Sequence, residues 1–296
     1  MAKTINVDFF KLSISQAGDS TFEDAYNLVS QLPKEEKIMF IDKIPLWLHS
    51  HRTTEQYIQG DMVRLRMDNL PAKGKLSGTI ENLDLEDDEG ISEQSAFFYS
   101  KSTNVLLLQK VVGGVDIGRF CKYFSEISEF SGTIIAEPIL EADAMRKFKN
   151  FKEIREFEIK IASLESLEIY KDIDPSVEEI LELNSELNSS TISVTFSAER
   201  KKENHISIKR AMDIAKSLLK IHGHESSKVR KVNAMGISDT DESIYLDLLG
   251  TRMREKIDIS FSGSQRNRDI PYAIRIDAIK KAWTKKQEEL VKMFKA

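Results

Sequence analysis

Apolar residues alternate with polar ones in several short segments, a pattern that predicts β-strands. Residues 4–14 alternate in this way. Residues 95–111 contain two such runs joined by the polar turn Ser100 to Asn104, which is typical of a β-hairpin. In residues 155–163 the apolar side chains fall on one face of a further strand. We therefore expect a fold with several antiparallel strands.

Apolar residues spaced three and four positions apart predict helices between these strands. The clearest segments are 115–127, 207–222 and 271–294. Ser20 and Glu23 have the spacing of a capping box and predict the start of a shorter helix. Strands and helices are mixed without a regular βαβ repeat, so we expect an α+β fold with mixed, mainly antiparallel sheets and packed helices in two lobes.

The acidic and polar stretch from Asp172 to Ser190 predicts a linker. We therefore expect an acidic α+β domain at 1–188 and a basic α+β domain at 189–296. Residues 200–296 contain 22 Lys and Arg against 13 Asp and Glu, a net charge of +9, whereas the preceding residues contain 21 against 35, a net charge of −14. This asymmetry favours either a polyanionic partner for the basic part or docking of the basic part on the acidic part.

The single cysteine, Cys121, excludes an intramolecular disulfide and fits a reducing compartment. The first residues lack the features of a secretory signal, and no run approaches the roughly 18 apolar residues of a membrane span. We therefore expect a cytoplasmic protein.

No common catalytic motif occurs in the chain, so we expect no catalytic residue, no metal site and no cofactor. A metal-dependent nuclease stays open as an alternative. Glu156 and Glu158 followed by Lys160 would share one strand face, as in nuclease sites, although any half-buried strand shows its polar side in the same way. A third hypothesis is a protein-interaction module that has no nucleic acid partner.

The segment from Arg200 to Lys231 has a net charge of +7. Its predicted helix has an apolar stripe that would face the core, which leaves the basic side chains on the solvent side. Flexible basic side chains suit contacts to duplex phosphates without base reading, and the segment has no interleaved aromatic residues for stacking on single strands. The candidate DNA-binding residues are Arg200, Lys201, Lys202, Lys209, Arg210, Lys216, Lys220, Lys228, Arg230, Lys231, Arg266 and Arg268.

The order of these segments resembles that of the phage-exclusion DNA-binding proteins of the lambda rex system and related uncharacterised bacterial proteins. The similar segments are residues 95–114, 132–140, 141–148, 155–162, 191–220 and the terminal helix with Tyr272. The resemblance implies a homodimer that binds the backbone of double-stranded DNA without sequence preference and acts in phage defence by abortive infection. Whether the protein also has a protein or membrane effector partner stays open. The acidic run from Asp84 to Glu89 departs from the pattern and leaves the role of the N-terminal domain open.

Overall fold

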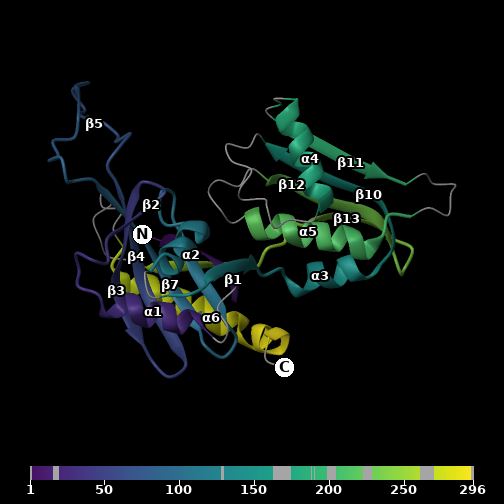
Figure 1. Cartoon of the computed structure of the whole chain (residues 1–296), viewed down its shortest axis with the longest axis horizontal. Helices are drawn as coiled ribbons and strands as arrows, with labels where there is room; N and C mark the ends of the chain where they lie inside the picture. The colour runs from purple at the N-terminus through teal and green to yellow at the C-terminus, as the bar shows by residue number, and fades with distance from the viewer. Residues whose placement is uncertain are drawn as a thin grey trace. The chain divides into compact units, whose positions relative to one another are not determined.

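The structure, a computed structural model, shows an α+β protein, as the sequence predicts (Figure 1). It describes residues 2–15, 20–127, 130–162, 175–187, 189, 191–198, 205–222, 229–260 and 270–294. The chain divides into two compact units. Unit 1 consists of Met1–Ile135 and Glu255–Ala296, and unit 2 consists of Ala136–Arg254. Unit 2 is therefore inserted into the sequence of unit 1.

Unit 1 is built on an eight-stranded sheet in the order β14-β1-β8-β7-β4-β3-β2, with β9 also paired to β1. From β1 to β2 along this path, neighbouring strands pair in the antiparallel sense. A separate two-stranded ribbon pairs β5 with β6. The strands are β1 (Ala2–Ser15), β2 (Met39–Ile41), β3 (Ile44–Thr53), β4 (Tyr57–Arg66), β5 (Lys73–Gly74), β6 (Ile80–Glu81), β7 (Ile91–Ser100), β8 (Val105–Lys110), β9 (Thr133–Pro138) and β14 (Arg254–Ser260).

Helices cover both faces of this sheet. Neighbouring residues on a strand point to opposite faces. The Phe97 ring lies 5.1 Å from that of Phe120 on α2 (Ile117–Ser125), whereas the Phe98 ring lies 5.7 Å from that of Trp283 on α6 (Tyr272–Phe294). Helix α1 (Phe22–Gln31) packs beside α2. Burial on both faces explains the uninterrupted apolar runs 96–99 of β7 and 105–108 of β8.

A buried ion pair joins α6 to the middle of this sheet. The Arg275 guanidinium donates two hydrogen bonds, of 2.7 and 2.6 Å, to the two carboxylate oxygens of Asp61 on β4. It also donates to the Gln94 side chain at 2.5 Å and to the Ile270 carbonyl at 2.7 Å. Asp61 and Arg275 are only 1% and 3% exposed. Each buried charge is therefore stabilised mainly by the opposite charge of the other.

Unit 2 contains a four-stranded antiparallel sheet in the order β11-β10-β12-β13. Its strands are β10 (Phe151–Ala162), β11 (Thr191–Ser197), β12 (Val229–Ser238) and β13 (Ser243–Asp247). Its helices are α3 (Ala142–Lys149), α4 (Pro175–Glu186) and α5 (Ile208–His222). Helix α5 contacts β10 and β12, α4 contacts β11, and α3 contacts α5 and β13.

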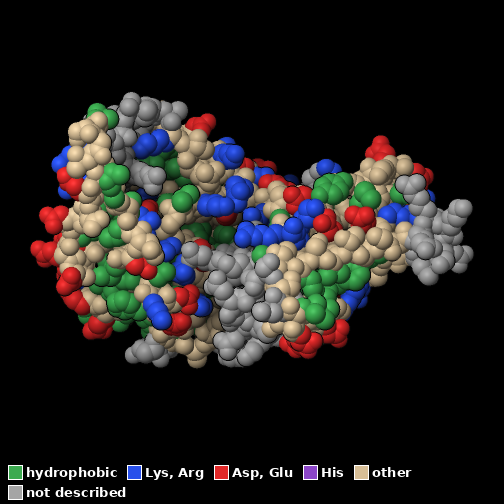
Figure 2. All heavy atoms as spheres, turned by 90° about the horizontal axis from the view of Figure 1, so that it is seen from above, with side chains coloured by type: hydrophobic (Ala, Val, Ile, Leu, Met, Phe, Trp, Pro, Cys, Tyr) green, Lys and Arg blue, Asp and Glu red, His purple; other side chains and the backbone are tan. Residues whose placement is uncertain are grey.

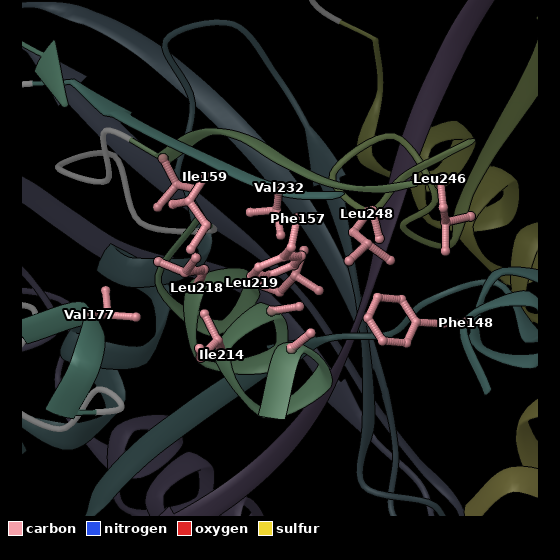
Figure 3. Packing of buried hydrophobic residues seen from close by; sticks show 14 of the residues in the cluster. Phe148, Phe157, Ile159, Val177, Ile214, Leu218, Leu219, Val232, Leu246 and Leu248 are labelled. Carbon is pink, nitrogen blue, oxygen red and sulfur yellow. The ribbon is translucent and has the colours of Figure 1, made fainter. Parts of the chain in front are cut away.

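The three helices in the described part of unit 2 pack on the same face of its sheet. Phe157 and Ile159 of β10 and Val232 of β12 form one apolar cluster with Leu218 of α5 and Val177 of α4 (Figure 3). Alternate residues of the strands face away from this cluster. Unit 2 thus has two layers among its described residues, with helices on one side and an open sheet face on the other.

The boundary predicted between 1–188 and 189–296 does not coincide with the division into units, because both ranges contribute to one sheet. Strand β11 pairs with β10 over seven residue pairs, from Glu156 with Ser197 to Ala162 with Thr191. Residues 255–296 return to unit 1. Pairing between strands that are distant in the sequence is not visible in the composition of either segment. Composition alone therefore placed the boundary between two strands of one sheet.

Helix α1 begins one residue later than the predicted capping box. Thr21, not Ser20, is the N-cap, and its hydroxyl accepts a hydrogen bond from the Asp24 N–H, while the Asp24 carboxylate accepts from the Thr21 N–H at 2.7 Å. The two overlapping pairs Ser20 with Glu23 and Thr21 with Asp24 both fit the motif, and the prediction chose the wrong one.

None of the helices in the described part of the chain combines the length and the apolar character that crossing a bilayer requires.

Candidate nucleic-acid interface

The structure separates the predicted DNA-binding residues into different groups. Lys209, Arg210 and Lys216 lie exposed on α5, and Lys220 follows on the same helix, although its side chain is not described. Arg230 and Lys231 lie on β12. Arg200, Lys201, Lys202, Lys228, Arg266 and Arg268 lie outside the described residues.

Helix α5 presents the first group on its outer side, as the apolar spacing predicts. Ala211, Ala215 and Leu218 are buried against the sheet. Lys209 and Lys216 are seven residues apart, about 10 Å along the helix axis, and therefore share one side of the helix. Asp213 is exposed between them. The Arg210 guanidinium donates to the Ser176 hydroxyl of α4 at 3.1 Å.

Helix α3 adds three basic side chains that the sequence analysis did not include. Arg146, Lys147 and Lys149 are exposed in its last turn, where positive charge is favourable for the helix dipole. The neighbouring Phe148 is buried in the cluster shared with α5 and the sheet. The cluster of basic residues around Phe148 was visible in the sequence, but it was assigned to the acidic domain.

Arg230 and Lys231 belong to a different part of unit 2. Lys231 lies opposite Lys160 of β10, whereas the next residue, Val232, faces the helices. Lys231 therefore projects from the open face of the sheet. The exposed surfaces of α5 and of the open sheet face lie on opposite sides of unit 2, so the predicted residues do not form a single continuous site.

The charge asymmetry along the sequence also disappears in the folded units. Unit 2 contains 19 Lys and Arg against 22 Asp and Glu, and unit 1 contains 24 against 26. The net charges are −3 and −2. Acidic and basic side chains are intermixed on the face shown in Figure 2. Any interaction with a polyanion must therefore depend on local clusters of basic side chains, not on the charge of a whole unit.

The residues of the alternative nuclease reading lie as predicted on one face of β10. Glu156, Glu158 and Lys160 alternate with Phe157 and Ile159, which face the helices. In the described part of the chain, no three His, Cys, Asp or Glu side chains are grouped so that they could hold a metal ion.

The Glu158 carboxylate is already engaged with side chains of the neighbouring strand β12. Its Oε1 and Oε2 atoms lie 3.0 Å from the Lys231 ammonium, and Oε2 also accepts a hydrogen bond of 3.3 Å from the Asn233 amide. The hydrogen bond to Glu158 raises the pKa of Lys231. This arrangement holds Lys231 in its charged form on the sheet surface.

A hollow of about 500 Å³ lies at the other end of the open face. It is lined by Glu156, Met235 and Ser197 from three adjacent strands, together with Arg155. Arg155 is the extra residue of a β-bulge, since Ile154 pairs with Gly236 and Glu156 pairs with Met235. The Arg155 guanidinium binds the Glu153 carboxylate, at 2.6 Å from Nε. The hollow therefore combines the positively charged Arg155 guanidinium with the Met235 side chain and the Ser197 hydroxyl.

A protein-family model described as a family of unknown function, DUF6731, matches residues 1–288. No curated protein matches the chain.

Proposed function

We propose a function for this chain, which belongs to the DUF6731 family of unknown function: it binds the phosphate backbone of double-stranded DNA through α3 and α5 of unit 2. The observation that supports the proposal is a set of six exposed basic side chains on these two adjacent helices. They are Arg146, Lys147, Lys149, Lys209, Arg210 and Lys216.

The form of this surface favours backbone contacts. Four of the six residues are lysines, whose flexible side chains act as point charges on phosphates, whereas reading bases relies on arginines or amides held in bidentate geometry. The apolar sides of both helices are buried in the core of unit 2. Binding through the outer sides therefore needs no rearrangement of the fold, and we expect no sequence preference.

The test measures binding of a random-sequence duplex by fluorescence anisotropy across a salt series from about 50 to 200 mM. The variant Lys209→Ala/Arg210→Ala/Lys216→Ala should bind more weakly. Each phosphate contact contributes about −0.9 to the slope of log affinity against log salt, so the slope should flatten by up to about 2.7. An equivalent variant of the three basic residues of α3 should act in the same direction.

The control variant is Lys280→Ala/Lys281→Ala/Lys285→Ala on α6 of unit 1, which removes the same charge from an exposed helix surface. It should leave affinity and slope nearly unchanged. Equal weakening by the α5 and α6 variants would contradict the assignment to unit 2. If the wild-type protein does not bind the duplex at the lowest salt concentration, the proposal that it binds DNA is wrong.

The biological setting that we propose is phage defence, on the basis of the resemblance to phage-exclusion proteins. Expression of the protein should lower the plating efficiency of a susceptible phage, and the α5 variant should restore it. Unchanged plating would contradict this setting. The same resemblance implies a homodimer, which sedimentation velocity of the purified protein tests directly.

A further inference from the structure

The open face of the unit 2 sheet has an ordered distribution of side chains. Cross-strand pairing places Ser193, Lys160 and Lys231 in one row and Ser197, Glu156 and Met235 in another. The two rows are four residues apart, about 13 Å along the strands. One end of the face is therefore basic and the other combines polar with apolar groups.

At the basic end, positive side chains lie next to one another, and their repulsion lowers the stability of the sheet. Lys160 and Lys231 are direct cross-strand partners, and like charges in this position are destabilising. A register shift also places Arg230 beside them, because β12 has one more residue here than β10. Glu158 compensates Lys231, but no described residue pairs with Lys160 or Arg230. Among the described residues, Lys160 and Arg230 thus remain without a carboxylate partner at this end, as an anion-binding surface requires.

An exposed aromatic residue lies at the other end. Tyr245 of β13 pairs with Met235 of β12, and their side chains are 62% and 38% exposed. Both face away from the helices, since Ala234 and Leu246 beside them belong to the buried cluster. The hollow lined by Met235, Glu156 and Ser197 adjoins this pair. The basic segment of the sequence lacks aromatic residues, and strand pairing supplies one from β13.

We infer that this open face binds single-stranded nucleic acid, with a base stacked on Tyr245 and phosphates held by Lys160 and Arg230. Open antiparallel sheets with exposed aromatic residues bind single strands because unpaired bases offer their faces for stacking, whereas a duplex keeps its bases stacked inside. Positive side chains farther along the same face hold the backbone. Both the ligand and the surface differ from those of the proposed duplex binding by α3 and α5. The inference does not rest on that proposed function.

The test uses fluorescence anisotropy with a labelled oligothymidine of about 10 nucleotides, a length within the range of known single-strand sites. Tyr245→Ala should weaken binding at least about fivefold, since stacking contributes that much or more for each base. Tyr245→Phe keeps the ring and should bind like the wild type. Lys160→Ala/Arg230→Ala should flatten the salt slope by up to about 1.4, at about 0.7 for each single-strand phosphate.

The matched control is Lys280→Ala/Lys281→Ala on α6 of unit 1, which removes the same charge as Lys160→Ala/Arg230→Ala from an exposed helix surface and should leave oligothymidine binding within twofold. Duplex binding is measured on the same variants, so that failure of one proposal is distinguishable from failure of the other. Ultraviolet cross-linking followed by mass spectrometry should place the attached nucleotide on the peptide that contains Tyr245.

Three results would overturn the inference. The first is absence of oligothymidine binding by the wild type at about 50 mM salt, where the electrostatic contribution is large. The second is equal binding by wild type and Tyr245→Ala. The third is a change of sedimentation coefficient in Tyr245→Ala without a change in oligonucleotide affinity, which would make this face an interface between copies of the chain.

Discussion

Replacing Asp61 by asparagine removes a negative charge from the interior of unit 1 and leaves the size of the side chain almost unchanged. Asp61 supplies two of the four hydrogen bonds that the structure shows for the Arg275 guanidinium. Asparagine keeps one acceptor oxygen, but its amide group would face an Arg275 donor. The Arg275 charge would remain buried with only the Gln94 and Ile270 oxygens as further partners.

Loss of one partner of a buried ion pair costs about 3–5 kcal/mol, because the remaining charge is neither hydrated nor compensated. Asp61→Asn should lower the free energy of unfolding of unit 1 by that amount. With an m-value near 2 kcal/mol per molar urea, the unfolding midpoint falls by roughly 1.5–2.5 M. Both tryptophans of the chain, Trp47 and Trp283, belong to unit 1, so their fluorescence reports the unfolding of this unit.

An exposed ion pair on the same helix provides the control. Asp277 and Lys281 of α6 are about 60% exposed and 2.8 Å apart. Asp277→Asn should change stability by less than about 1 kcal/mol. Arg275→Met should destabilise as strongly as Asp61→Asn, and the double variant should lose less than the sum of the two single variants. A cost for Asp61→Asn no larger than that for Asp277→Asn would refute the reasoning.

Three further outcomes test other parts of the structure. Burial and the neighbouring Lys37 ammonium lower the pKa of His51, so protonation favours the unfolded chain, whose histidine titrates near about 6.5. Stability should therefore fall as pH drops from about 7.5 through 6.5, and urea titrations should show a smaller fall for His51→Gln. Burial raises the pKa of the Cys121 thiol, so iodoacetamide should label it, by mass spectrometry, only after unfolding. Gly236→Ala should disrupt unit 2, seen by hydrogen exchange, because its Cβ would lie 2.1 Å from the Glu153 carbonyl oxygen.

The local elements were predictable because their signals lie within a few consecutive residues. The helix expected at 207–222 is α5 at Ile208–His222, and the helix expected at 271–294 is α6 at Tyr272–Phe294. The predicted hairpin corresponds to β7 and β8, joined at the turn after Ser100. In each segment the apolar period and the flanking turn or breaker residues agree with the observed structure.

The arrangement of these elements was not predictable in the same way. Strand β13, in which the exposed Tyr245 lies between the core-facing Ile244 and Leu246, was not predicted. The predicted domain boundary also separated α3 and β10 from β11 and α5, although all four contribute to unit 2. Which exposed basic residues share a surface depends on these long-range pairings. The sequence therefore indicated the type of side chain at the candidate site but not which residues lie together.

The insertion of unit 2 between β9 and β14 has a consequence for the order of events during synthesis. Residues 1–135 leave the ribosome first, and the carboxylate of Asp61 then has no Arg275, which is translated 214 residues later. Residues 136–254 emerge next as an uninterrupted set, so unit 2 is complete while unit 1 still lacks β14 and α6. The second unit along the chain can thus reach its native state before the first, which reverses the usual N-to-C order of domain folding in translation.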